Sequence, residues 1–155
     1  MALRYLGPDF DIHGGGLDLV FPHHENERAI GEAYADQRYC EYYLHNGFVT
    51  VGNEKMSKSL GNFVTLRSML DRHDPEVVRV FLLSKQYREP LNYDDASIGE
   101  AQKRVDRWRA LTTQIERSSH GHTAGAALAA PVCPARDAFW AALDNDFDFG
   151  RALVA

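Results

Sequence analysis

The densest group of side chains that could do chemistry is the run His23-His24-Glu25-Asn26-Glu27. If a helix begins at Pro22, His23 and Glu27 lie one turn apart on the same side of it. An imidazole and a carboxylate placed in this way can share a zinc ion, although a zinc site needs further ligands from elsewhere. The alternative interpretation is a solvated helix start whose acidic residues are stabilised by the helix dipole. The spacing alone leaves both interpretations open.

A second group, Lys55-Met56-Ser57-Lys58-Ser59, places two lysines three residues apart among hydroxyl side chains. Gly52 and Gly61 flank this group and would allow a loop to close over a ligand. Two ammonium groups and two hydroxyls on such a loop are suited to holding a polyphosphate. The alternative interpretation, which composition alone favours, is an exposed basic loop without a ligand.

A third group is the glycine run Gly14-Gly15-Gly16, which Asp18 follows closely. A glycine-rich stretch after a strand, with a carboxylate nearby, can lie against the ribose of a nucleotide. The dinucleotide-binding pattern Gly-x-Gly-x-x-Gly is absent, because Leu19 stands where its last glycine would be. Taken alone, this run favours a tight turn.

These groups need elements to position them, and the sequence predicts an α/β arrangement up to about residue 93. Strands are expected at 10–13, ending at the three glycines, and at 48–51. Helices are expected at 23–35, at 66–72 after the N-cap Thr65, and from Pro75 onward, and residues 86–93 are expected to form a polar connection. The apolar side of the first helix carries Ala29, Ile30, Ala33 and Tyr34. The buried side of the third carries Val77, Val78, Val80, Phe81 and Leu82.

The remainder of the chain is predicted to be helical. A long helix over 95–117 carries apolar residues at helical spacing, namely Ile98, Val105, Trp108 and Leu111. Residues 118–130 are rich in Ser, Gly, Ala and His and are expected to form a flexible linker. Another helix is expected from Pro131 to about Leu143.

The composition is that of an ordinary globular chain, with 155 residues, 45% hydrophobic and 25% charged. The net charge of −5 argues against a general nucleic-acid binder. No apolar run approaches the roughly 20 residues that span a bilayer, and Met1–Asp9 has no secretory pattern. Cys40 and Cys133 are too few for a disulfide framework, so we expect a reducing compartment, the cytoplasm.

The order of these groups resembles a known family. The run Lys55–Ser59 is similar to the signature loop of class I aminoacyl-tRNA synthetases. The segments Asp11–Asp18, Phe21–Glu27 and Lys58–Phe63 resemble the cysteinyl-tRNA synthetase family in particular. The resemblance extends from about residue 9 to about residue 115.

This resemblance implies a fold and an activity. Residues 1–93 would form part of a Rossmann-like nucleotide-binding domain with the lysine loop, and residues 94–155 the start of a helical bundle leading to an anticodon-binding region. The family joins cysteine to ATP, which enters with Mg²⁺, and passes the cysteinyl group to tRNA(Cys). It also binds one Zn²⁺ per full-length chain.

The resemblance assigns roles residue by residue. His23 and Glu27 match two zinc ligands of the family, and His13 matches a histidine that lines the cysteine pocket. Lys58 matches the ATP-binding catalytic lysine, with Lys55 and Ser57 assisting it. The stretch that holds the adenosine ribose is matched by Gly16 and Asp18.

Two features of the family are missing from this chain. The other zinc ligands, two cysteines, and the signature His-Ile-Gly-His precede the matching segment in the family, and this chain has no such tetrapeptide. We therefore expect an internal fragment that lacks the N-terminal catalytic half, is inactive by itself and exposes apolar surface. Cys40 matches no ligand position and is expected to be a small buried residue. The alternatives are a ligase joining cysteine to an amino sugar in mycothiol biosynthesis, and a non-catalytic synthetase-derived fragment.

Overall fold

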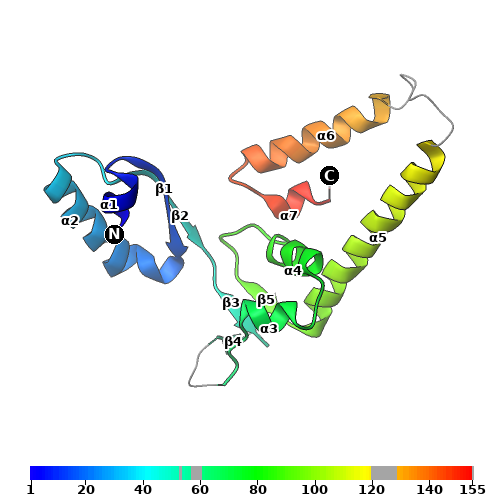
Figure 1. The fold of residues 1–155 in the computed structure, drawn as a ribbon, viewed down its shortest axis with the longest axis horizontal. Helices are drawn as coiled ribbons and strands as arrows, with labels where there is room; N and C mark the ends of the chain where they lie inside the picture. Colours follow the sequence, from blue (N-terminus) through cyan, green and yellow to red (C-terminus); the bar gives the residue numbers. More distant parts are fainter. Residues whose placement is uncertain (53, 57–60, 120–128, 155) are drawn as a thin grey trace. The chain divides into compact units, whose positions relative to one another are not determined.

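The computed structural model describes residues 1–52, 54–56, 61–119 and 129–154, with the backbone alone at residues 55, 119 and 129–133. Two compact units divide the chain (Figure 1). The first comprises Met1–Phe48 and Arg88–Pro90, and the second comprises Val49–Tyr87 and Leu91–Ala155. Both contain short parallel strands with helices, which confirms the predicted α/β class. Among the described residues, none of the helices combines the length and apolar composition needed to cross a membrane.

The first unit is built on a two-stranded parallel sheet. Its elements in chain order are α1 (Ala2–Leu6), β1 (Phe10–Gly16), the 3₁₀ turn η1 (Leu17–Leu19), the π-helical turn η2 (Val20–His24), α2 (Glu25–Ala35) and β2 (Cys40–Asn46). The parallel pairing of β1 with β2 places His13 beside Tyr43 and Gly15 beside His45. Side chains of the two strands at these positions therefore share one face of the sheet.

Two expectations for this unit need correction, and two of its elements were not expected. The glycine run continues β1 instead of ending it, because the pairing with β2 extends to Gly16 and Asn46. The helix begins at Glu25, since residues Val20–His24 form the π-helical turn first. The sequence patterns also predict neither α1 nor β2.

The helix α2 packs through a glycine. Gly31 is buried, and a side chain there would collide with the ring of buried Tyr39. The bulky residues Ile30 and Tyr34 are instead 71% and 83% exposed, so the predicted apolar side is not buried in this chain. Because this surface is open, the expectation of exposed apolar surface is confirmed.

The second unit combines a three-stranded sheet with most of the helices. Its elements are β3 (Val49–Val51), β4 (Glu54–Lys55), α3 (Leu66–Leu70), α4 (Pro75–Leu82), β5 (Leu91–Tyr93), α5 (Asp95–Ser119), α6 (Ala129–Asp144) and α7 (Phe149–Ala152). The central strand β3 pairs antiparallel with β4 and parallel with β5. Thr65 caps α3 in a reciprocal capping box with Ser68, as predicted for that helix start.

The core of the second unit lies where α4 packs against α5. Its buried members are Met69, Val77, Val78, Val80, Phe81, Ile98, Ala101 and Val105. The predicted burial of the α4 face is thus confirmed for four of its five residues. Leu82 is 44% exposed, because it is the last residue of α4 and lies at the end of the face that packs against α5.

Other boundaries in this unit differ from the sequence expectations. Lys55 belongs to β4 and not to a loop, since Gly52, at φ 60°, allows the chain to turn back along β3. Residues 91–93 form β5 instead of a polar connection. The predicted linker at 118–130 is helical at both ends, because α5 extends to Ser119 and α6 begins at Ala129. Its residues 120–128 lie outside the described part of the chain.

The turn between α6 and α7 is tied to the segment that follows α4. Gln86 donates from Nε2 to the carbonyl and the carboxylate of Asp146, at 3.1 and 3.0 Å, and the Tyr87 hydroxyl donates to the other carboxylate oxygen at 2.9 Å. Asp146 and Phe147 both have a φ of 55°, in the left-handed region that few side chains adopt. These contacts hold the turn and fix the end of α6 within the second unit.

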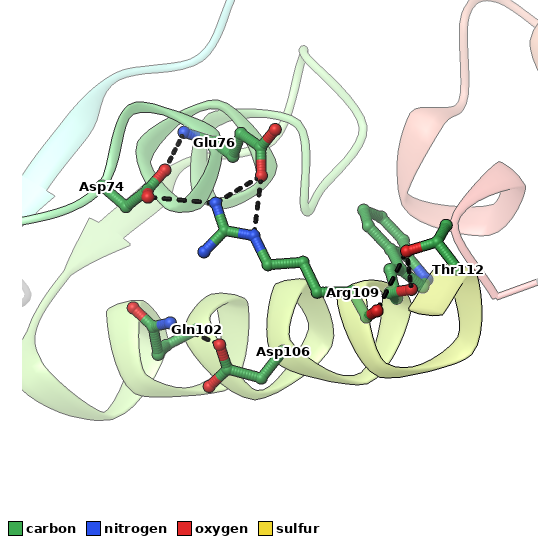
Figure 2. Close-up of polar contacts among 7 residues, drawn as sticks. Asp74, Glu76, Gln102, Asp106, Arg109 and Thr112 are labelled. Atoms are coloured by element: carbon green, nitrogen blue, oxygen red, sulfur yellow. Dashed lines mark hydrogen bonds and ion pairs between the residues drawn. The ribbon is translucent and has the colours of Figure 1, made fainter. Parts of the chain in front are cut away.

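An arginine on α5 bridges to the start of α4 (Figure 2). The Arg109 guanidinium donates to Asp74 Oδ2 at 3.0 Å and to Glu76 Oε2 at 2.6 and 3.1 Å. Asp74 is also the N-cap of α4 and accepts from the Glu76 backbone N–H at 2.8 Å. This backbone hydrogen bond, followed by the bond from Arg109, lowers the pKa of Asp74.

The lowered pKa of Asp74 predicts acid sensitivity. Its stabilising effect is complete above the unfolded carboxyl pKa, about 4, and is lost as the pH falls through the lower folded value. Asp74→Asn retains the cap but not the charge, so this variant should lose less stability than the unsubstituted chain on acidification. The measurement is the urea midpoint between about pH 7 and about pH 3. Parallel pH curves for the two proteins would contradict the assignment.

Candidate metal and nucleotide site

The middle of β1, the end of the π-helical turn and the first turn of α2 bring three possible metal ligands together. His13 lies on β1, His24 ends the π-helical turn and Glu27 lies in the first turn of α2. One ligand atom from each lies within 4.8 Å of the others. His13 donates from Nε2 to Glu27 Oε2 at 2.9 Å, so the imidazole orients the carboxylate.

The structure places His23 at the margin of this cluster. Its Nε2 lies 3.8 Å from Glu27 Oε2, as the four-residue spacing suggested, and its side chain is 58% exposed. His24, by contrast, is only 4% exposed. His13 and Glu27 are therefore in contact with each other, and His23 approaches the same carboxylate from the solvent side. Buried His24 is an additional member of the cluster that the spacing argument did not predict.

His24 is held by a second histidine from β2. Its Nδ1 shares a hydrogen bond with His45 Nε2 at 2.8 Å. Burial lowers the pKa of His24, and the neighbouring His13 and His45 lower it further, against the opposite effect of Glu27. The imidazole is thus neutral at neutral pH and offers a nitrogen lone pair.

This donor set fits a zinc ion. Imidazole nitrogens and a carboxylate oxygen are ligands that zinc accepts. Cys40 is not one of the gathered groups. It is buried, and its Sγ lies 3.7 Å from the carbonyl of Tyr42, which confirms the prediction of a small buried residue.

The glycine run ends beside a carboxylate. Gly16 closes β1, and Asp18 lies exposed in the following 3₁₀ turn. A Cβ on Gly16 would lie 2.7 Å from Asp18 Oδ1, so the carboxylate occupies the space that a side chain would fill. Because Asp18 is exposed, its carboxylate is available to a hydroxyl-bearing ligand.

The lysine motif is only partly described. Lys55 contributes backbone to β4, paired with Thr50 on β3, and Gly61, beyond the motif, has a φ of 66°. Ser57 and Lys58 lie outside the described residues. Their assignment to ATP therefore stays a prediction from sequence.

Comparison with known proteins identifies the family. Residues 1–103 match the family of tRNA synthetases class I (C) catalytic domains. The chain belongs to this synthetase family. Both the histidine cluster and the lysine motif lie within the matched part of the class I synthetase domain.

Several curated relatives of this synthetase chain carry the same name. "Cysteine--tRNA ligase" of Syntrophobacter fumaroxidans is 46% identical over 164 residues, covering 99% of this chain and 33% of the relative. The protein of the same name from Thermococcus onnurineus is 44% identical over 162 residues, covering all of this chain and 34% of the relative. The chain spans about a third of the length of the curated relatives it matches.

A solved structure supports the fold. The crystal structure of a ternary LeuRS–tRNA–LeuAMS complex from Agrobacterium radiobacter K84 matches 93% of this chain and 21% of its own chain, with a TM-score of 0.72. Its sequence identity to this chain is 21%, so the likeness concerns the class I synthetase fold alone.

Proposed function

We propose that this chain supplies part of the zinc-dependent cysteine site and the ATP-binding loop of a cysteine–tRNA ligase that acts in the cytoplasm, and that the other zinc ligands come from outside this chain. The observation that carries the proposal is the cluster of His13, His24 and Glu27, with His23 beside it, within a class I synthetase domain. The name shared by the curated relatives supports the choice of cysteine and tRNA(Cys) as substrates.

His23 and Glu27 are the proposed zinc ligands. Zinc with an open coordination position binds a thiolate directly, which favours cysteine over serine, whose oxygen is harder and far less acidic. His13 holds the Glu27 carboxylate through its 2.9 Å hydrogen bond and lines the cysteine pocket. Because outer-shell hydrogen bonds orient ligands, this contact favours one position of the carboxylate.

ATP, entering with Mg²⁺, would be held by Gly16, Asp18 and the lysine loop. A carboxylate oxygen of cysteine attacks the α-phosphorus of ATP, and the bond to pyrophosphate breaks. Lys58, assisted by Lys55 and Ser57, stabilises the negative charge that grows on phosphorus and pyrophosphate. A ribose hydroxyl of tRNA(Cys) then attacks the carbonyl carbon of the adenylate, and AMP leaves.

Zinc binding by the complete polypeptide tests this proposal. His23→Ala should lower zinc affinity by more than the roughly 10- to 100-fold typical of an outer-shell change, and cysteine affinity should fall with it. The measurements are competition with a chelator and cysteine-dependent ATP–pyrophosphate exchange. Glu41→Gln is the control. Glu41 lies exposed on β2, where it pairs with Arg38, so this variant should match the unsubstituted protein.

Two results would contradict the proposal. If the complete unsubstituted polypeptide bound no zinc, the assignment of His23 and Glu27 as ligands would be wrong. If the activated cysteine were transferred to an amino sugar and not to tRNA(Cys), the proposed acceptor would be wrong and the proposed activation step would stand.

A further inference from the structure

We infer that His45 is a positioning residue of this site, which fixes the ring of His24 and through it the His13–Glu27 pair. The inference rests on the proposed function, because it concerns the same zinc and cysteine site. Its basis is the 2.8 Å hydrogen bond between His45 Nε2 and His24 Nδ1. In such a bond between two imidazoles one nitrogen donates and the other accepts, so the contact selects which nitrogen of His24 carries a proton.

The strand register brings His45 to this position. β2 pairs with β1 so that His45 stands beside Gly15, and both residues use the face of the sheet that carries His13 and Tyr43. Gly15 has no side chain, and the His24 ring takes its place, since a Cβ there would lie 2.8 Å from His24 Cε1. The His24 ring therefore packs against Gly15 on one strand and hydrogen-bonds to His45 on the next.

The ring of His24 in turn supports His13. Their centroids lie 4.4 Å apart with an interplanar angle of 63°, an edge-to-face contact. His13 then donates to Glu27. The contacts therefore form one continuous series from His45 through His24 and His13 to the proposed ligand carboxylate.

Two roles of His45 can be distinguished: orienting the His24 ring, or only filling space in the core. His45 also stacks on Tyr43, with ring centroids 6.2 Å apart and planes 4° from parallel. A residue that only filled space would be replaced well by phenylalanine, which keeps the ring. A residue that orients His24 would be replaced better by glutamine, whose terminal amide reaches about as far as Nε2 and can donate or accept.

The test compares His45→Phe with His45→Gln in the complete polypeptide. His45→Phe should lower zinc affinity about tenfold, within the range of outer-shell changes, and raise the KM for cysteine more than it lowers kcat. His45→Gln should restore most of both. His73→Phe is the matched control, because His73 lies in the second unit, 3.4 Å from the Tyr93 hydroxyl, and it should behave as unsubstituted protein.

The readouts are chelator competition for zinc, the absorption spectrum of the cobalt-substituted protein and exchange kinetics. Unchanged zinc affinity and spectrum in His45→Phe would overturn the inference, and so would equal losses in the phenylalanine and glutamine variants. If His23→Ala loses zinc but His45→Phe binds it normally, this inference alone is wrong. If the unsubstituted protein binds no zinc, the proposed function is wrong.

One measurement needs no variant and covers the case in which His45→Phe does not fold. A ¹⁵N–¹H correlation spectrum of the imidazoles in unsubstituted polypeptide should show His24 in a single tautomer. Exchange of His24 between its two tautomers would overturn the inference even if zinc binds.

Discussion

Replacing Lys58 by alanine in the complete polypeptide is expected to slow adenylate formation by a factor on the order of 10² to 10³, as for removal of one preorganised charge-stabilising donor. Negative charge at the α-phosphate and on pyrophosphate rises during attack, and only interactions that strengthen at that moment accelerate the step. ATP affinity should change less. Lys58→Arg should restore the rate only in part, because a planar guanidinium does not reproduce a compact ammonium charge.

The measurement is pre-steady-state adenylate formation together with a separate determination of ATP affinity. Arg67→Ala is the control, since Arg67 is exposed on α3 and carries the same charge close to the loop in sequence. If Lys58→Ala left the activation rate intact, the functional interpretation of residues 55–59 would have to be abandoned. An equal loss in Arg67→Ala would show a general effect of surface charge instead.

The second large effect is expected in the core. Phe81 is 1% exposed, and its ring meets that of Tyr93 edge to face, at 5.8 Å and 72°. Phe81→Ala removes this packing and leaves a cavity, which should lower the free energy of unfolding of the second unit by about 3–5 kcal/mol. That loss corresponds to a factor of about 10² or more in the folding equilibrium.

Leu82→Ala provides the comparison on the same helix. Leu82 adjoins Phe81 but is 44% exposed, so its truncation should cost less than about 1.5 kcal/mol. Urea unfolding of this chain, followed by a probe in the second unit, measures both variants. Similar losses in the two would show that the core is not centred on the face of α4 that carries Phe81.

Local signals predicted the helices of the second unit well. Thr65 and Pro75 mark helix starts by their own chemistry, and the Val77-to-Phe81 stretch marks the buried side of α4. The strands β2 and β5 were missed, because short strands are stabilised by partners far along the chain, Phe10–Gly16 for β2 and β3 for β5. No local pattern in 40–46 or 91–93 reports those partners.

The same distinction applies to the site. The four-residue spacing of His23 and Glu27 is local, and their proximity could be predicted. His45 reaches His24 only because β1 and β2 pair, each residue of β1 with the residue 30 positions later in β2, such as Phe10 with Cys40. The spacing of residues in the sequence does not reveal this contact. A histidine in a strand that follows two tyrosines would have become a candidate only once β2 was recognised.

Three consecutive glycines at the end of β1 leave that end of the strand without side chains that could fix its alignment with β2. If β2 slipped by one residue, backbone bonding would be equally satisfied, but Leu44 or Asn46 would stand opposite Gly15 in place of His45. Such a misaligned sheet would be folded and yet lack its pair of imidazoles. The fraction of a refolded preparation that forms the His24–His45 bond therefore measures the fidelity of strand alignment, which spectroscopy of backbone structure would not detect.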